Sequence, residues 1–152
     1  MRERRGKPKN KTVGALSIPE KERGRIRKFL GRLLKKENGI FFAYLHGSFA
    51  EARPFRDIDV AVFVDEKKVP KEEALDFEIL TSMSLEKEIR LPIDLKIINY
   101  APLGFQYYST AGTLIMCKED DLRVDFLTRI RSLYFDFKPS SERFLLEMIY
   151  AG

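Results

Sequence analysis

Two short motifs in the first half of the chain carry residue types suited to phosphoryl transfer chemistry. Gly47 and Ser48 follow one apolar run, and Asp57 and Asp59 stand two positions apart at the start of a second. Side chains two apart on a strand point to the same face, so both carboxylates project into one space. Carboxylates this close repel each other unless a cation neutralises them. The spacing therefore predicts a divalent metal site and metal-assisted phosphoryl or nucleotidyl transfer.

A third aspartate, Asp94, opens the apolar run 93–98, where a carboxylate is costly unless it is paired or bound to a metal. Three such acids could hold two Mg²⁺ ions roughly 3.5 to 4 Å apart, one at the acceptor hydroxyl and one at the leaving pyrophosphate. We expect Asp57 and Asp59 to bind both ions. Asp94 is expected to bind only the ion on the acceptor side and to help deprotonate the attacking hydroxyl.

The residues around the Gly-Ser pair have competing interpretations. Gly47 lets the backbone approach a phosphate closely and Ser48 adds a hydroxyl, so together they could hold a triphosphate. Taken alone, however, Gly-Ser is an ordinary turn and Asp-x-Asp is often a polar strand end. His46, the single histidine, either touches substrate or is a satisfied structural residue. Tyr107 and Tyr108 are more typical of a core or a partner interface and are left out of the site.

Hydrophobic periodicity and helix signals predict the elements that position these residues. Ser17 and Glu20 have the spacing of a capping box at the start of the first helix, and Asn99 is a candidate cap for a short helix. The predicted order is helix 18–37, strand 40–45, strand 58–64, helix 70–87, strand 94–98, helix 101–111, strand 113–117, and two helices after residue 120 on either side of Pro139. Helices alternating with strands predict an α/β (α+β) fold, a single domain with a small mixed central sheet flanked by helices.

Charge divides the chain of 152 residues into two parts. Residues 1–14 hold six Lys or Arg and one acid, Glu3, which accounts for the whole net charge of +5 and leaves 22 basic and 22 acidic residues in the remainder. We predict a disordered basic tail over 1–16 and a folded domain over 17–152. The balanced body gives no sign of a nucleic-acid surface, so direct nucleic-acid binding is expected only through the tail. The tail is either a solubilising terminus or an arm that contacts RNA, DNA or an acidic partner.

Composition predicts the cellular setting. Cys117 is the single cysteine, so no intrachain disulfide can form, and its apolar neighbours favour a core position. No apolar stretch reaches the roughly 20 residues of a membrane span, and we expect a cytoplasmic protein with no membrane partner. The charged fraction of 34% with one Gln and three Asn leans toward a thermophilic source.

Gly47-Ser48, Asp57-Ile58-Asp59 and Asp94 together resemble the three motif elements of the minimal nucleotidyltransferases (MNT) of the DNA polymerase beta superfamily, in the antitoxin branch paired with HEPN toxins. The similarity extends over most of residues 20–150. It implies that residues 17–152 form a nucleotidyltransferase domain that transfers AMP from ATP to a hydroxyl of a partner HEPN toxin, a tyrosine in that branch, with two Mg²⁺ ions. By position, Gly47 and Ser48 would bind the phosphates of the nucleoside triphosphate, and the three aspartates would be the catalytic metal ligands.

The chain departs from the family pattern between the two motifs. The family usually has Arg-Gly after Gly-Ser-x-Ala and a serine before Asp-x-Asp, whereas here Glu51 follows Ala50 directly and Arg56 takes the serine position. The loop is about two residues short. Arg53 and Arg56 could compensate as nucleotide-binding residues, because guanidinium groups bind phosphate oxygens well. Two alternatives stay open: a non-catalytic antitoxin module that only binds its partner, and a nucleotidyltransferase with a small-molecule acceptor.

Overall fold

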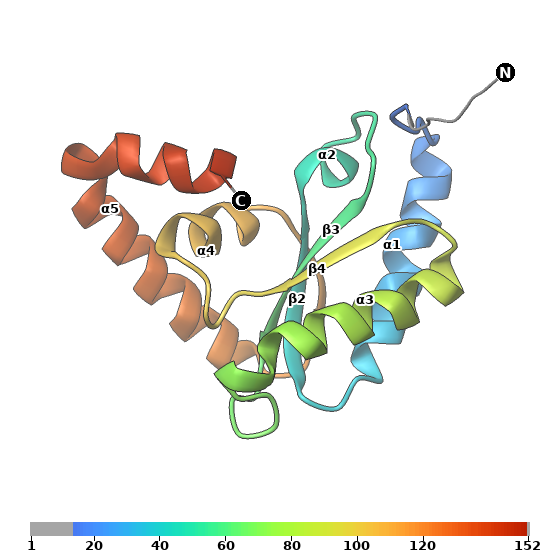
Figure 1. Ribbon diagram of the computed structural model, residues 1–152, viewed down its shortest axis with the longest axis horizontal. Helices are drawn as coiled ribbons and strands as arrows, with labels where there is room; N and C mark the ends of the chain where they lie inside the picture. The colour runs from blue at the N-terminus through green and yellow to red at the C-terminus, as the bar shows by residue number, and fades with distance from the viewer. Residues whose placement is uncertain (1–13, 152) are drawn as a thin grey trace, which may run out of the picture.

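The computed structural model describes the backbone of residues 14–151 and the side chains of residues 14–137. The elements in chain order are α1 (Glu20–Lys35), β2 (Ile40–His46), α2 (Gly47–Ala50), β3 (Ile58–Val64), η2 (Lys71–Glu73), α3 (Ala74–Ile89), β4 (Ile93–Ile97), α4 (Leu103–Ser109), β5 (Thr113–Cys117) and α5 (Asp120–Ala151). They form the predicted α/β fold with a small mixed sheet flanked by helices (Figure 1). Among the described helices, none combines the length and the apolar character needed to cross a membrane.

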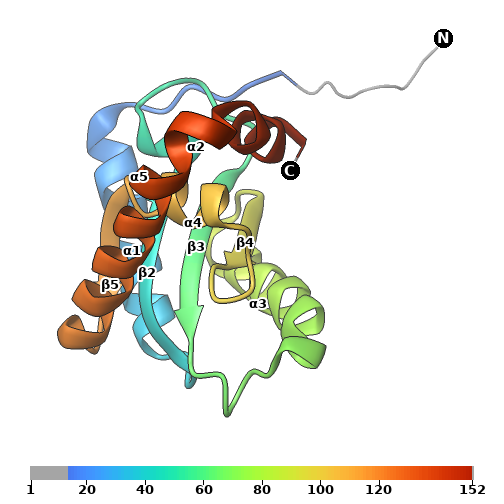
Figure 2. The ribbon, with the colours of Figure 1, turned by 90° about the vertical axis from the view of Figure 1, so that its left-hand side faces the viewer.

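The sheet has four strands in the order β4-β3-β2-β5. The pairs β2–β3 and β2–β5 are antiparallel, and β3–β4 is parallel. Helices α1 and α3 lie on one side of the sheet and α4 and α5 on the other (Figures 1 and 2). Ile58, Val60 and Val62 of β3 belong to the core on the α1 and α3 side, and Ala61 and Phe63 belong to the core on the α4 and α5 side. Asp59 shares the parity of Ala61, so it points to the α4 and α5 side.

Helix α3 covers the exposed edge of β4. Three acceptors spaced one turn apart on α3 receive the β4 amides: Glu86 from Ile93 at 2.8 Å, Ser82 from Leu95 at 3.2 Å and Glu78 from Ile97 at 2.8 Å. An edge strand whose amides are paired in this way is held in place and protected from pairing with other chains. The strand that carries Asp94 is therefore fixed on both sides.

The predicted helix starts need two corrections. Helix α1 begins after Pro19, and no side chain caps it. The predicted capping box is therefore wrong: Glu20 accepts a bond from Arg27 at 2.5 Å and does not reach back to Ser17. Asn99 is not the cap of α4, since Pro102 takes the N-cap position. The Asn99 side chain instead bonds the backbone N–H and C=O of Val64 at 2.8 and 2.9 Å, where it joins the end of β3 to the end of β4.

The C-terminal part forms one helical element, α5, where the sequence predicts two helices. Figure 1 shows that α5 changes direction sharply toward its C-terminal end. Pro139 lies within α5, and proline kinks a helix because it lacks an amide hydrogen and its ring crowds the preceding turn. The prediction of two separate helices is therefore wrong, because residues 120–151 form one helical element that bends.

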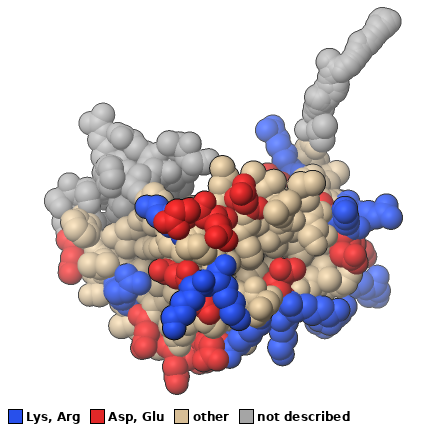
Figure 3. Space-filling view, turned by 60° about the horizontal axis from the view of Figure 1, so that its bottom comes forward, with Lys and Arg blue, Asp and Glu red and all other residues tan. Residues whose placement is uncertain are grey.

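The N-terminal boundary of the folded chain lies before residue 17. Leu16 exchanges two backbone hydrogen bonds with Phe55, at 2.7 and 3.0 Å. Residue 16, which the sequence analysis assigns to the tail, is thus paired with the loop that precedes β3. Residues 1–13 lie outside the described residues, and the disordered tail stays a prediction. The face shown in Figure 3 carries both acidic and basic side chains, and neither sign covers it alone.

Candidate active site

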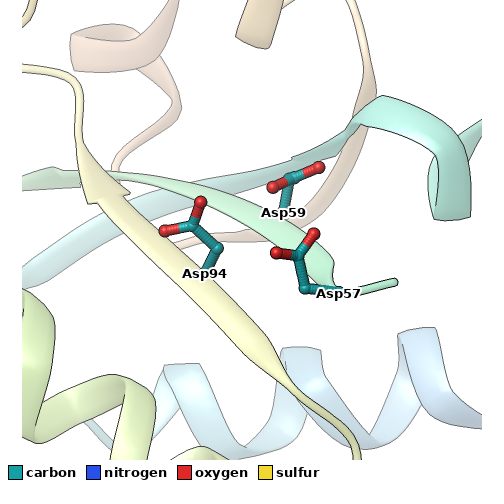
Figure 4. A group of neighbouring side chains, drawn as sticks. All are labelled: Asp57, Asp59 and Asp94. Atoms are coloured by element: carbon teal, nitrogen blue, oxygen red, sulfur yellow. The ribbon is translucent and has the colours of Figure 1, made fainter. Parts of the chain in front are cut away.

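The three predicted aspartates come together on the α4 and α5 side of the sheet. The parallel register pairs Asp59 of β3 with Asp94 of β4, and Asp57 lies in the bend directly before β3. Figure 4 shows the three carboxylates converging, and one oxygen of each lies within 4.8 Å of the others. The structure thus confirms the convergence that the strand spacing and the third acid predict.

The cluster is electrostatically unfavourable without a cation. Burial, followed by the charges of Asp57 and Asp94, raises the pKa of Asp59 to about 7, and Lys96 opposes this rise. Burial and the charge of Asp94 also raise the pKa of Asp57, against its own backbone amide and Arg56. Three carboxylates that share one space are the hard oxygen ligands that Mg²⁺ prefers. The donor set therefore fits a magnesium site.

Gly47 stands where β2 turns into α2, and its position next to Asp59 leaves no room for a side chain. Its φ is +77°, a conformation that favours glycine, and a Cβ on Gly47 would overlap the Asp59 carboxylate. The glycine therefore allows the turn and makes space for the acid. Ser48, the next residue, is partly buried, and its carbonyl accepts the Arg53 amide at 3.0 Å. Gly47 thus borders the acidic cluster and Ser48 follows it in the chain, while their binding of phosphate stays a prediction.

A buried arginine that the sequence analysis does not single out holds the short loop between the two motifs. Arg23 of α1 is 3% exposed and donates to three carbonyls: Ile18 at 2.8 Å, Phe49 at 2.9 Å and Arg53 at 2.8 Å. Its guanidinium also lies 5.1 and 5.2 Å from the ring centroids of Phe49 and Phe55. Nothing in the sequence distinguishes Arg23 from its charged neighbours on α1, because two of the three carbonyls it binds lie 26 and 30 residues further along the chain.

The two arginines proposed for the nucleotide are in different situations. Arg53 is exposed and forms an ion pair with Glu51, with Nη2 2.6 Å from Oε1. Arg56 lies close enough to Asp57 for its charge to lower the pKa of that carboxyl. The structure therefore pairs Arg53 with the loop's own acid, whereas Arg56 is exposed and keeps the place beside Asp57 that the sequence gives it.

A cavity of about 520 Å³ opens beside the acids. Its lining residues come from β2, β3, β4, α3, α4 and the segment that joins β4 to α4: His46, Asp59, Ala74, Glu78, Asp94, Lys96, Ile97, Tyr100, Ala101, Pro102, Phe105, Tyr108 and Ser109. Sequence reasoning missed most of these residues because they belong to different elements. Tyr108, which the sequence analysis leaves out of the site, lines this cavity, whereas Tyr107 stacks on Tyr134 with ring centroids 3.8 Å apart.

His46 is the direct cross-strand neighbour of Asp59. Burial lowers the pKa of His46 to about 4, although the charge of Asp94 opposes this effect, so the ring is neutral at pH 7. Its Nε2 is buried and has no hydrogen-bond partner among the described residues. The ring meets Phe105 edge to face, with centroids 5.4 Å apart. His46 thus contributes an uncharged ring to the lining of the cavity beside the acids.

The chain belongs to the polymerase beta nucleotidyltransferase family: residues 28–121 match the family described as "Polymerase beta, Nucleotidyltransferase". The match includes all three aspartates and the Gly-Ser turn. A comparison with curated protein sequences found no match.

The fold is similar to solved structures of MntA–HepT toxin–antitoxin complexes, in which an MNT antitoxin accompanies a HEPN toxin. A toxin–antitoxin structure with AMP-PNP gives a TM-score of 0.59 at 16% identity, over 82% of this chain and 98% of the matched chain. A tri-AMPylated HEPN toxin from Shewanella oneidensis in complex with its MNT antitoxin gives 0.59 at 16% identity, over 84% and 98%. At these identities the likeness establishes the fold.

Proposed function

We propose that this chain is a Mg²⁺-dependent nucleotidyltransferase that transfers AMP from ATP to a hydroxyl of a HEPN toxin, and so acts as the antitoxin of a toxin–antitoxin pair. The observation that carries the proposal is the convergence of Asp57, Asp59 and Asp94 within 4.8 Å in a chain of this family. Such a constellation is suited to a two-metal displacement at phosphorus.

Each residue of the site has a proposed role. Asp57 and Asp59 would be ligands for both Mg²⁺ ions and Asp94 for the ion on the acceptor side; bound metal would neutralise charge on the phosphates and make the acceptor hydroxyl more acidic. Gly47 and Ser48 bind the triphosphate through the turn that ends β2. The acceptor oxygen forms a bond to the α-phosphorus of ATP, its proton passes to Asp94, and pyrophosphate leaves.

Arg56 is the stronger of the two candidate phosphate-binding arginines, because it directly precedes Asp57 in the chain and its charge acts on that carboxyl. Arg53 must give up its ion pair with Glu51 to reach a phosphate. That pair is exposed at both ends and costs little to break, so a role for Arg53 requires only a change of side-chain conformation.

Similarity to solved complexes supports the nature of the partner. One of them is described with AMP-PNP, and another contains an AMPylated HEPN toxin together with its MNT antitoxin. We extend both features to this chain: ATP as the donor, and a HEPN-domain protein of the same organism as the acceptor.

The test is incubation of the purified chain with that HEPN protein, ATP and Mg²⁺, followed by intact-protein mass spectrometry. We expect AMP adducts on the HEPN protein, and none with Asp57→Asn or with EDTA. An unmodified HEPN protein that nevertheless forms a complex, and whose toxicity Asp57→Asn still neutralises, would favour the non-catalytic binding module. Turnover of ATP with small hydroxylated acceptors but not with the HEPN protein would favour a small-molecule nucleotidyltransferase.

A further inference from the structure

Lys96 is a positively charged residue in the candidate active site, and it lies outside the three motif elements. It follows Asp94 by two positions on β4 and therefore projects from the same face of the sheet. Its Nζ lies 3.8 Å from Oδ1 of Asp94, and its side chain is about half exposed. Of the described residues that line the cavity beside the acids, Lys96 is the one lysine or arginine.

A simple ion pair with Asp94 explains the position of Lys96 poorly. The contact is long and exposed at both ends, and pairs of this kind contribute little to stability. The lysine also competes for the same carboxylate oxygens that a metal would use. Once cations occupy the acids, the ammonium group stands next to like charge unless an anion enters the site with them.

We infer that Lys96 binds the triphosphate of the nucleotide, moving from Asp94 to a phosphate oxygen when the metal–nucleotide complex enters the cavity. The inference deepens the proposed function and rests on it. A lysine suits this exchange because its ammonium group is a compact charge on a flexible stem with three donors. From its position on β4, the Lys96 ammonium group can reach either the Asp94 carboxylate or a phosphate oxygen.

Two titrations separate this role from a structural one, using the full chain. The first follows Mn²⁺ alone by electron paramagnetic resonance, and the second follows a non-hydrolysable ATP analogue with Mg²⁺ by calorimetry. The variants are Lys96→Gln, which keeps length and polarity but removes the charge, and Lys96→Arg, which keeps the charge. Lys87→Gln is the matched control, because Lys87 is exposed on α3 away from the cavity.

The two titrations should move in opposite directions in Lys96→Gln. Nucleotide affinity should fall about tenfold or more, the effect of losing one charge-assisted contact, while Mn²⁺ alone should bind a few-fold more tightly because a competing cation is gone. Lys96→Arg should retain most of the nucleotide affinity, and Lys87→Gln should match the unmodified chain in both titrations.

Three results would overturn the inference. Nucleotide affinity equal to that of Lys87→Gln would show that Lys96 does not touch the triphosphate. Tighter binding of both Mn²⁺ and nucleotide would make Lys96 only a competitor of the metal, and weaker binding of both would make it a residue that orders the acids. A fourth result concerns the proposed function itself. If the unmodified chain binds no nucleotide, the proposed function fails together with the inference, whereas the three results above concern Lys96 alone.

Discussion

Replacing Asp59 by Asn should make the metal-free protein more stable at alkaline pH. The pKa of Asp59 is raised from 3.8 to about 7, mainly by burial and by the charges of Asp57 and Asp94. The folded state therefore holds a proton that the unfolded chain has already released between about pH 4 and 7. Between these pH values the folded state binds more protons than the unfolded state, so the free energy of unfolding falls as the pH rises. The stability that is fully present below pH 3.8 is therefore lost once the pH has risen through about 7.

The magnitude follows from the size of the shift. A pKa change of about three units corresponds to about 4 kcal/mol at 1.36 kcal/mol per unit. Because Asp59 is only partly buried, solvent screens part of this cost, and we reduce the expected effect to about 2 kcal/mol. In Asp59→Asn the group no longer ionises, so this part of the pH dependence should disappear.

The assay is urea unfolding in EDTA at pH 4 and pH 8, with Asp125→Asn as a control at an exposed position of α5. Between these pH values, the unmodified chain should lose about 2 kcal/mol of unfolding free energy relative to Asp59→Asn. Asp125→Asn should follow the unmodified chain. Added Mg²⁺ at pH 8 should stabilise the unmodified chain and Asp125→Asn but not Asp59→Asn. Identical pH profiles for the unmodified chain and Asp59→Asn would refute the electrostatic account of the cluster.

Three further substitutions test how the backbone around the acids is built. Gly47→Ala should lower both Mg²⁺ affinity and thermal stability, since its Cβ would overlap the Asp59 carboxylate and φ is positive there; metal titration and a melting curve check this, and an unchanged affinity would contradict it. Arg23→Met should cost about 3 kcal/mol in urea unfolding, because three carbonyls lose their donor at about 1 kcal/mol each, whereas the exposed Arg25→Met should change stability by less than about 0.5 kcal/mol. Ala52→Gly should stabilise the chain by up to about 1 kcal/mol, because glycine adopts the left-handed conformation of residue 52, φ 61°, without strain. Melting temperatures check this, and an unchanged melting temperature would show that the loop is not strained at Ala52.

The short loop between the Gly-Ser turn and Asp57 is built differently from what the family pattern predicts. The pattern expects a second glycine, whereas this chain places Ala52 in a left-handed conformation. Arg23 and the Leu16–Phe55 pair hold the loop from outside, through contacts with α1 and with the segment that precedes it. The loss of the second glycine therefore does not prevent the three acids from converging in this fold.

Local sequence determined the chemistry available to this protein. The spacing of Asp57 and Asp59 at the start of an apolar run predicted two carboxylates in one space, and the structure brings them together although Asp57 precedes β3. Apolar runs and helix signals predicted strand β3 and strand β5 with the bounds observed, because these patterns depend on near neighbours in the chain. The sequence also identified the Gly-Ser turn, which follows an apolar run, and the third acid, Asp94, which opens another.

The tertiary structure alone decided how these parts meet. The parallel register that sets Asp94 beside Asp59 joins strands separated by α3, and no local pattern fixes such a pairing. The same is true of Arg23, whose partners lie up to 30 residues away. Periodicity also located helix α3 but did not show which face of the helix is buried. Glu78, Ser82 and Glu86 face the edge of β4, and Leu75 is left 65% exposed. Long-range pairing is chosen by the packing of the whole chain, and that choice converts three separate aspartates into one site.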